Sequence, residues 1–464
     1  MSAVLRSTTT TSTRAAPRRK RTSPTSRSKT DPTIRRATAG ASQFSQRAVL
    51  RGGPFALCVW RKQALVDDST PPLSPLNMNT ISPFSAGAPA GVVTARMIRP
   101  DTGGTWAEPF LDQWRDLSDN ALEPNAFYAP EMLLPSLRHL LGDHDVRIFT
   151  LWSEINGNSR LRGLAPVAPE STLGKAPMPN ISTWQHMHGF LGTPLIVPGW
   201  ETPFWSHFCE TIADTWWGGL LRIRRTDANG PSAAALRALC VAHDIPVREV
   251  SRQERAFLTV PADPAAYLAE QMRGKKRKEL RRQRRRLEET GNLTLEIVRS
   301  GAAEVDRFIA DFHSLEGGGW KGESGTAIAQ SDAESGFFEG AIRDAAEAGH
   351  LLGLVHRLDD RPVAILVNLL AADGCFSFKT AYDEALSAYS PGVQIQIDNM
   401  TVLADAGIRW SDSCAAKDHP MINSVWGERR TIADLVVAQP GTLRRGLFTA
   451  LGAGETIYRR LRNR

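Results

Sequence analysis

The turn Ser390-Pro391-Gly392 has the residue types of a helix start that could hold a phosphate. Ser390 can cap the helix, and Pro391 suits its first turn because a backbone N–H there would have no partner. Glycine lets a ligand approach the backbone, and the unpaired N–H groups of Gly392, Val393 and Gln394 lie at the positive end of the helix. The turn therefore favours a bound phosphate, although an ordinary helix cap uses the same residues.

Three predicted strands lead into this turn. Apolar runs over 351–358 and 363–370 are joined by a polar turn, and Asp373-Gly374 is a strong hairpin signal before a third strand over 375–382. Apolar residues at Val393, Ile397 and Met400 predict a helix, which Gly407 ends, and a further strand begins near 408–411. This order predicts an α+β unit with a mixed sheet, in which the glycine-containing turn is the candidate ligand-binding segment.

The composition indicates a globular protein of two or three domains. The chain has 464 residues and 42% hydrophobic content, without an apolar run of the roughly 18–20 residues that a membrane span requires. The five cysteines are scattered and include no C-x-x-C pair, which argues against a zinc site or a disulfide framework. We therefore expect buried, reduced cysteines, no metal and a cytoplasmic location.

The basic character of the chain belongs to its first 96 residues. That segment holds 15 Lys/Arg against three Asp, whereas the remainder has 41 basic and 46 acidic residues. It is rich in Ser, Thr, Pro and Arg, so we expect 1–96 to be a disordered tail, with structure beginning near Val92. A transit peptide or a basic arm for nucleic acid or acidic lipid would have this composition, and so would an unused leader if translation starts at Met78 or Met97.

The sequence predicts two α/β domains after the tail, over 97–260 and 261–440, with a C-terminal extension over 441–464. In the first, helical and strand patterns alternate up to a predicted strand over 247–258. His186 and His188 are two residues apart, as metal ligands on a strand would be, but no third ligand stands close in sequence. We interpret them as polar loop residues.

A basic helix is predicted at the start of the second domain. Ten Lys/Arg and a single acid, Glu279, lie between Arg273 and Arg286. Their mutual repulsion favours an anionic partner such as a transfer RNA, a CoA phosphate or an acidic carrier. The alternative is a solvated helix whose Leu280 and Leu287, seven residues apart, point inward.

A glycine-rich loop over 315–328 carries Trp320 and Lys321 at its tip. Its glycines, among them Gly317, Gly318, Gly319 and Gly322, permit backbone shapes that other residues resist. One aromatic residue on such a loop suits a lid over a substrate, so Trp320 and Lys321 are candidate substrate-binding residues. A mobile surface turn would have the same composition.

Several stretches resemble one family. They are ALEPNAFYAPEML (121–133), LRGLAPVA (161–168), KRKELRRQRRRLEETG (276–291), FHSLEGGGWKG (312–322), FKTAYDEALSAYSPG (378–392) and DHPMINSVWGERRT (418–431). The chain is similar to the cellulose-biosynthesis (CelD-type) acetyltransferase-like proteins of the GCN5-related N-acetyltransferase (GNAT) superfamily, which are close to the FemAB-type aminoacyl transferases. The resemblance implies two tandem GNAT-like domains, with acetyl-CoA or another acyl-CoA bound in the second and its pyrophosphate held by Ser390, Pro391, Gly392, Val393 and Gln394.

The same resemblance implies direct attack of an amine or hydroxyl on a thioester. Asp383 is the candidate base, Tyr382 a candidate acid toward the leaving thiolate, and Lys379 an electrostatic contact to the acyl group or acceptor. Strand alternation places Tyr382 on the face opposite Lys379 and Asp383, so the three converge only if the strand bends. Further candidates come from the last motif and the strand before it: Asp412, His419 and Glu428.

Three classes of function follow from these expectations. The first is an acyl-CoA-dependent acyltransferase acting on a glycan or another envelope precursor. The second is an aminoacyl-tRNA-dependent transferase, which the basic stretch 273–286 would favour. The third is a non-catalytic partner of a polysaccharide synthase, which the differences around the turn favour, since Tyr389 and Gln394 depart from the common loop pattern of the superfamily.

Overall fold

The computed structural model describes residues 92–100, 106–174, 176–215, 220–318, 328–439, 446, 448 and 449. Most of the predicted tail (1–91), the loop tip with Trp320 and Lys321, and nearly all of the predicted extension 441–464 lie outside the described residues. The first strand begins at Val92, within the segment assigned to the tail. No helix in the described ranges is long and apolar enough to span a membrane.

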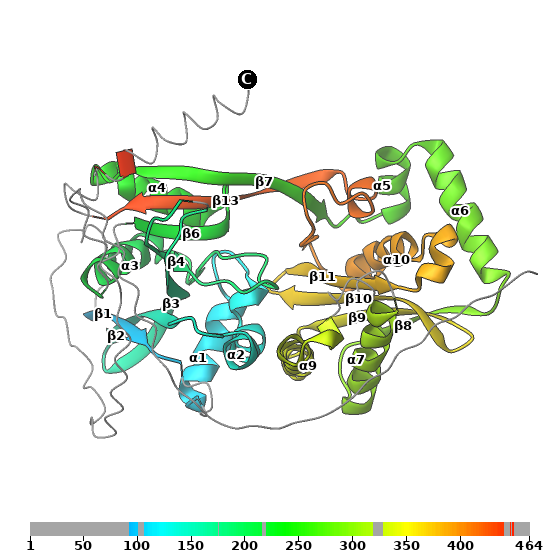
Figure 1. Ribbon diagram of the computed structural model, residues 1–464, viewed down its shortest axis with the longest axis horizontal. Coiled ribbons are helices and arrows are strands. Elements are labelled where there is room, and N and C mark those ends of the chain that lie inside the picture. The colour runs from blue at the N-terminus through cyan, green and yellow to red at the C-terminus, as the bar shows by residue number, and fades with distance from the viewer. Residues whose placement is uncertain are drawn as a thin grey trace, which may run out of the picture. The chain divides into compact units, whose positions relative to one another are not determined.

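The first half of the described chain alternates helices with strands. Its elements are β1 (Val92–Ile98), α1 (Glu108–Asp119), the short 3-10 helix η1 (Ala126–Tyr128), α2 (Pro130–His139), β2 (Arg147–Ile155), β3 (Asn158–Glu170), β4 (Asn180–Thr183), β5 (Leu195–Ile196), α3 (Glu201–Thr215), β6 (Leu220–Asp227), α4 (Pro231–Ala242) and β7 (Val247–Thr259) (Figure 1).

The second half begins with two helices that extend from β7. Its elements are α5 (Pro264–Gln271), α6 (Gly274–Glu288), β8 (Leu293–Val298), α7 (Ala302–Gly317), η2 (Ile328–Gln330), α9 (Asp332–Glu347), β9 (Leu351–Leu358), β10 (Arg361–Ala371), β11 (Gly374–Tyr382), η3 (Glu384–Tyr389), α10 (Pro391–Asp405), β12 (Trp410–Asp412), η4 (Ile422–Ser424) and β13 (Glu428–Ala438).

The two halves repeat one order of elements. β1, α1, α2, β2, β3, β4, α3 and β6 in the first half correspond to β8, α7, α9, β9, β10, β11, α10 and β12 in the second. In both halves the fourth strand of this order pairs in parallel with the strand that follows the next helix. In the first half β4 pairs with β6, which follows α3, and in the second β11 pairs with β12, which follows α10. The predicted mixed α/β architecture with two tandem units is therefore confirmed.

All strands of the described chain belong to one continuous sheet. Its order is β1-β2-β3-β4-β6-β13-β7-β12-β11-β10-β9-β8, with β5 paired to β3 beside this path. The late strand β13 lies between β6 and β7, pairing antiparallel with both. The far end of β7 pairs with β12 over Phe257–Thr259 and so joins the halves. The predicted boundary near residue 260 therefore falls within a shared sheet, and one strand from the second half completes the first.

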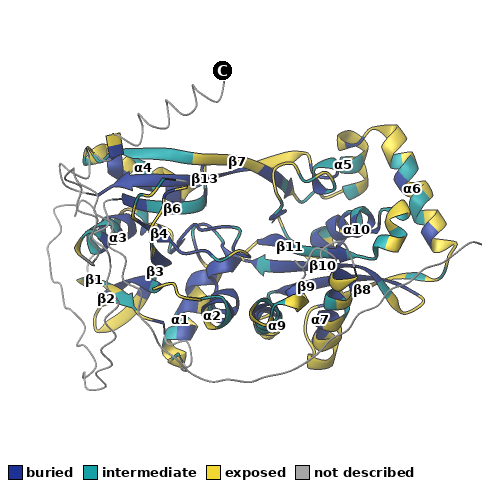
Figure 2. Ribbon diagram, in the orientation of Figure 1, coloured by how far each residue is buried: buried dark blue, intermediate teal, exposed yellow. Residues whose placement is uncertain are grey.

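The second half has cores on both faces of its sheet. On one face, α7 and α9 bury Phe308, Phe312, Phe337 and Phe338 against β9–β11. On the other, α10 packs against the same strands through Ile395 and Leu403. Figure 2 shows the contrast with α6, which is largely exposed and buries only Leu280 and Leu287, the two residues that the sequence predicts to point inward.

The predicted hairpins are confirmed with one shift in register. The turn between β10 and β11 consists of Ala372 and Asp373, with Ala372 at φ 48°, so Gly374 is already the first residue of β11. Gly374 is needed for a different reason: a Cβ there would lie 1.9 Å from the Trp410 ring. The glycine allows β12 to bring an indole against the strand.

Candidate active site

The sheet opens beside the last six residues of β11. Only Gly374, Cys375 and Phe376 pair with β12. In the described chain, the segment 377–382 pairs with β10 on one side and with no strand on the other. The N-terminus of α10 lies beyond this opening. On its open side, the backbone of 377–382 is exposed to a ligand and not to a neighbouring strand.

A β-bulge lies within the open segment. Val367 pairs with Lys379 and Asn368 with Ser377, so Phe378 is an extra residue on β11. Phe378 packs into the core under α7 and α9, and the Lys379 ammonium lies 5.5 Å from the centre of its ring. A bulge redirects the side chains that follow it, and here it turns Lys379 toward the α9 side of the sheet.

Lys379, His188 and Glu334 form a hydrogen-bonded chain on that side. Lys379 Nζ lies 3.1 Å from His188 Nδ1, and His188 Nε2 lies 2.9 Å from Glu334 Oε2. Because a lysine ammonium can only donate, His188 Nδ1 accepts, and its Nε2–H donates to the carboxylate. The His188 side chain is 8% exposed and stacks on Phe337. A cation, an imidazole and a carboxylate thus meet at the bulge.

The three groups come from three separate elements. Lys379 is on β11, His188 is on the loop after β4 in the first half, and Glu334 is in the first turn of α9. Ser331 caps α9, with its Oγ accepting from the Glu334 backbone N–H. The Ser-x-x-Glu spacing would be read as a capping box, so the sequence offered no signal that the Glu334 carboxylate turns to a histidine.

His186 supports the loop that carries His188. Its Nδ1 accepts a hydrogen bond of 3.3 Å from the His188 backbone N–H. Burial, with the nearby charges of Arg225 and Lys379, lowers the pKa of His186 to about 3, so its ring is neutral at physiological pH. Within the described ranges no group of His, Cys, Asp or Glu could hold a metal ion. His186 thus holds the loop through the His188 backbone N–H, and His188 contacts Lys379 and Glu334.

Tyr382 and Asp383 contact other elements. Tyr382 lies on the α10 side of β11, against Gly392. The Asp383 carboxylate accepts from the Ala385 backbone N–H at 2.9 Å and lies 3.1 Å from Arg361 Nη1. The bulge therefore does not bring these side chains to the partners of Lys379.

The predicted phosphate-binding turn forms the first turn of α10. Ser390 has a left-handed backbone (φ 55°), and its carbonyl oxygen accepts from Val393 N and Gln394 N. A Cβ on Gly392 would lie 2.8 Å from Met421 Sδ and 3.0 Å from the Tyr382 ring, so these side chains cover the glycine. The Gln394 amide donates to the Leu280 carbonyl and ties α10 to α6. A phosphate could reach the Gly392 α-carbon only if Met421 moved.

Asp412 lies in a buried ion network at the junction of the halves. It is fully buried, 2.6 Å from Arg255 Nη2 and 3.1 Å from Arg430 Nη1, and these cations lower its pKa despite its burial. Glu428 accepts from Thr259 N, and the His419 backbone accepts from Asn423 N. These three candidates lie on β12, β13 and the segment between them, and their contacts connect those elements to one another and to β7.

Residues 274–419 match the protein family described as Acetyltransferase (GNAT) domain. No curated protein sequence matches the chain. Among solved structures, FemX is similar at 11% identity and a TM-score of 0.48, over 73% of this chain and 98% of FemX. A tandem GNAT protein from the clavulanic acid biosynthesis pathway is similar at 14% identity and a TM-score of 0.40, over 75% and 99%. A conserved protein of unknown function from Bacteroides thetaiotaomicron gives 12% identity and 0.46, over 72% and 98%.

The family match defines residues 274–419 as a GNAT-type acetyltransferase domain. The matched segment includes the opening beside β11, the bulge, α10, Lys379 and Glu334. GNAT domains use acyl-CoA, and the chemistry of this class is acyl transfer. His188 lies outside the matched segment, so the first half of the chain contributes a side chain to the site of the second.

Proposed function

We propose that the protein is an acyl-CoA-dependent acyltransferase that acylates an amine or hydroxyl of a glycan or another cell-envelope precursor. The observation that carries the proposal is the Lys379–His188–Glu334 chain, which lies at the bulge of a GNAT domain where the sheet opens. The turn 390–394 is proposed to hold the donor pyrophosphate chiefly through the Gly392 backbone N–H, with Met421 displaced, because the Val393 and Gln394 N–H groups already donate to the Ser390 carbonyl oxygen, contrary to the expectation from sequence.

In the proposed reaction the acceptor nitrogen or oxygen attacks the thioester carbonyl, a C–N or C–O bond forms, and the C–S bond breaks. The Lys379 ammonium stabilises the oxyanion of the tetrahedral intermediate. When Lys379 turns to that oxygen, its ammonium leaves His188 Nδ1, which then takes the acceptor proton, and Glu334 stabilises the resulting imidazolium. The thiolate leaves and is protonated, so the acceptor proton is balanced by the thiol formed.

His188 is a better proposed base than Asp383. Both oxygens of the Asp383 carboxylate already have partners, the Ala385 backbone N–H and Arg361, which hold the carboxylate away from Lys379. Tyr382 faces the α10 side, where the donor pyrophosphate is proposed to bind, and stays a proposed proton donor to the leaving thiolate. Trp320, Lys321 and His419 stay proposed acceptor contacts.

The alternative donor is an aminoacyl-tRNA. The exposed basic helix α6 favours it, because a transfer RNA needs a positively charged docking surface. A link to the CelD-type or FemAB-type families, and to a polysaccharide synthase as partner, is proposed on the motif resemblance alone. Parallel titration of the full chain with acetyl-CoA and with charged tRNA distinguishes the donors.

The test of the reaction is Lys379→Met, with Lys417→Met as matched control. Lys417 is exposed and lies 3.8 Å from Asp418, outside the site. We expect Lys379→Met to lower kcat/KM about 100-fold, the usual loss for an oxyanion-stabilising group, and Lys417→Met to leave it unchanged. Thiol release and mass spectrometry over a panel of amino sugars, oligosaccharides and peptide amines measure it. Wild-type turnover by Lys379→Met contradicts the role of the ammonium.

A further inference from the structure

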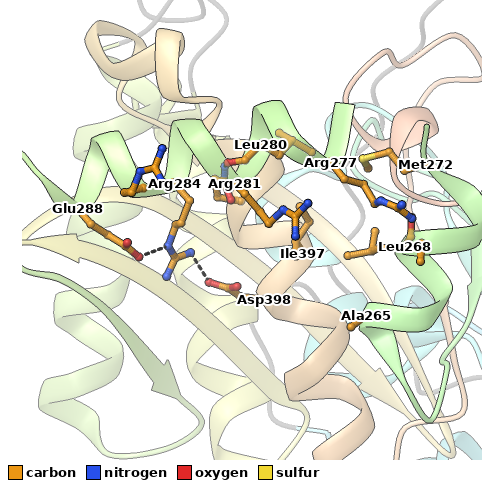
Figure 3. Close-up of a pocket in the computed structure, with 13 residues that line it drawn as sticks. Ala265, Leu268, Met272, Arg277, Leu280, Arg281, Arg284, Glu288, Ile397 and Asp398 are labelled. Atoms are coloured by element: carbon orange, nitrogen blue, oxygen red, sulfur yellow. Dashed lines mark hydrogen bonds and ion pairs between the residues drawn. The ribbon is translucent and has the colours of Figure 1, made fainter. Parts of the chain in front are cut away.

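A hollow of about 530 Å³ lies between α5, α6 and α10 (Figure 3). Its volume falls within the range of roughly 300–1,000 Å³ that small-molecule sites occupy. It borders α10, which packs on the face of the sheet opposite α7 and α9, whereas His188 and Lys379 meet on the α9 side. The hollow therefore lies on the other face of the sheet from the Lys379–His188–Glu334 chain, although Gln394 of the turn 390–394 also lines it, and an inference about it does not rest on the proposed chemistry of Lys379 and His188.

The floor of the hollow is apolar. Met272 and Leu280 are buried there, while Leu268 and Ile397 are only partly buried. α5 buries none of its residues, although Leu268 and two alanines face the hollow. Apolar side chains that line a hollow and remain exposed to water favour binding of a hydrocarbon or another apolar group, because binding removes their surface from water.

The rim of the hollow is cationic. Arg277, Arg281, Arg284 and Arg285 all line it from one face of α6. Figure 3 shows Arg277 and Arg281 extending from α6 over the floor. Positions 277, 281 and 284 recur at the four- and three-residue spacing that puts side chains on one helix face. The helix therefore gathers its charge at the mouth of an apolar hollow.

Only one of these arginines is firmly neutralised. Arg284 lies 2.7 Å from Asp398 and 2.9 Å from Glu288. Arg277 has a single long contact, 3.4 Å to the Leu268 carbonyl oxygen. Arg285 lies 3.9 Å from Glu289, and Arg281 forms no ion pair among the described residues, so the mouth carries unneutralised positive charge.

We propose that this hollow binds a phosphorylated amphiphile, a phosphate ester on a hydrocarbon chain. Arg277 and Arg281 would bind the phosphate, since a guanidinium can offer two parallel donors to one phosphate. The chain would cover Leu268, Ile397 and the buried floor beneath them. An RNA backbone needs a track of cations but no enclosed apolar floor, so the floor favours the amphiphile over a nucleic acid.

Calorimetry of the full chain with dodecyl phosphate tests the proposal. We expect saturable binding that strengthens from octyl to dodecyl phosphate, because each added methylene covers more of the floor. Dodecyl maltoside shares the chain without the phosphate, and inorganic phosphate lacks the chain. We expect each to bind at least tenfold more weakly than dodecyl phosphate. Equal affinity for the maltoside would overturn the phosphate site, and equal affinity for inorganic phosphate would overturn the apolar one.

A pair of arginines on α6 provides the matched variants. Arg281→Ala removes a charge at the mouth, whereas Arg286→Ala removes one from an exposed position outside the lining. We expect Arg281→Ala to weaken dodecyl phosphate binding about tenfold, the usual size of one charge-assisted contact, and Arg286→Ala to change it less than twofold. Equal losses from both, matched by equal losses of polyuridine binding, would overturn the hollow and make α6 a general polyanion surface.

Two further experiments test the apolar floor of the hollow and the source of the ligand. Leu268→Gln, on a helix that buries no residue, should abolish the gain with chain length while leaving the melting temperature within a few degrees. An unchanged chain-length series in a folded Leu268→Gln protein would overturn the floor. Co-sedimentation with phosphatidylcholine vesicles containing phosphatidic acid, lost in Arg281→Ala, supports a membrane lipid as source. Binding of dodecyl phosphate without co-sedimentation supports a dispersed phosphate ester.

Discussion

The helices α3 and α10 follow corresponding strands in the two halves, yet they bury opposite kinds of surface. α3 buries Phe204, Trp205 and Phe208, and Gly163 makes room for the Phe204 ring, which a Cβ there would meet at 2.3 Å. α10 instead buries Gln394, Gln396 and Asn399. The first half fills this position with a packed aromatic core, whereas the second combines buried amides with aliphatic side chains such as Ile395 and Leu403.

The polar side of α10 is incompletely paired within the protein. Gln396 donates to Ser377 at 3.1 Å, and Asn368 donates to Asn399 at 2.9 Å. Within the described chain, Gln396 Oε1, Asn368 Oδ1 and Asn399 Nδ2 are buried without a hydrogen-bond partner. Buried amides without partners are costly, so they are retained where solvent or a ligand can satisfy them. The second half therefore keeps buried amides on a helix whose counterpart in the first half buries aromatic rings.

The largest expected effect comes from removing an aromatic ring that α3 buries. Phe204→Ala should cost about 3–5 kcal/mol of unfolding free energy, because it leaves a cavity against Phe149 and Gly163. Gln396→Ala should cost only about 1 kcal/mol, since it removes one hydrogen bond to Ser377 and a longer one to Thr380. Urea unfolding of both variants measures the contrast. Similar losses for the two would mean that α10 packs as tightly as α3.

The next effect concerns the residue that the first half contributes to the second. His188→Ala should lower turnover about 100-fold by removing the proposed base and the partner of Lys379. Met187→Ala is the control, because the Met187 side chain is 63% exposed on the same loop. Steady-state kinetics with thermal melts separates lost chemistry from lost folding. Full activity in a folded His188→Ala protein would restrict the site to the second half alone.

A pH-dependent contact also joins the halves. His350, directly before β9, lies 3.3 Å from Asp119 and is hydrogen-bonded to Glu131, and these carboxylates raise its pKa to about 10. A folded-state pKa above the ordinary 6.5 means that the stabilisation is complete below pH 6.5 and is lost as pH rises to about 10. We expect a fall of about 1–2 kcal/mol over that window.

His350→Gln isolates this contribution. Its unfolding free energy should lie below that of the wild type at pH 6 and meet it near pH 10. Chemical denaturation at several pH values measures both curves. Parallel curves across the window would show that His350 is not the titrating group.

The smallest expected effect compares glycines beside the two helices. Gly392→Ala should cost less than about 1 kcal/mol, because the atom it meets is the flexible end of Met421. Gly163→Ala meets the Phe204 ring and the Leu195 carbonyl oxygen and should cost about 2–3 kcal/mol. Thermal melts compare them, and calorimetry with CoA should show a few-fold loss for Gly392→Ala only. Unchanged CoA affinity would argue against the proposed pyrophosphate site.

Local patterns predicted most elements of the sheet and α10. The apolar runs on either side of Asp359-Asp360 became β9 and β10, and α10 begins at Pro391 and ends shortly before Gly407. These features depend on residues close together in sequence, where turn chemistry and periodicity decide the structure. The basic helix α6 and its two inward leucines followed from the same reasoning.

The assembly of the site could not be read from such patterns. Lys379 and His188 were singled out separately, but they are 191 residues apart and meet only because a bulge turns the lysine toward the loop after β4. Glu334 was not predicted, since its spacing from Ser331 is explained by helix capping alone. The pairing of β13 with β6 was missed for the same reason, because long-range register leaves no local signal.

The position of β13 also constrains the order in which the chain can fold. Asp434 on β13 pairs with Arg222 on β6, 212 residues earlier in the chain. During synthesis the first half is made with β6 and β7 present but the strand between them still missing. Their unpaired edges must then wait, exposed to wrong partners, until the second half has been translated. The native sheet can therefore close only after β13 has been translated.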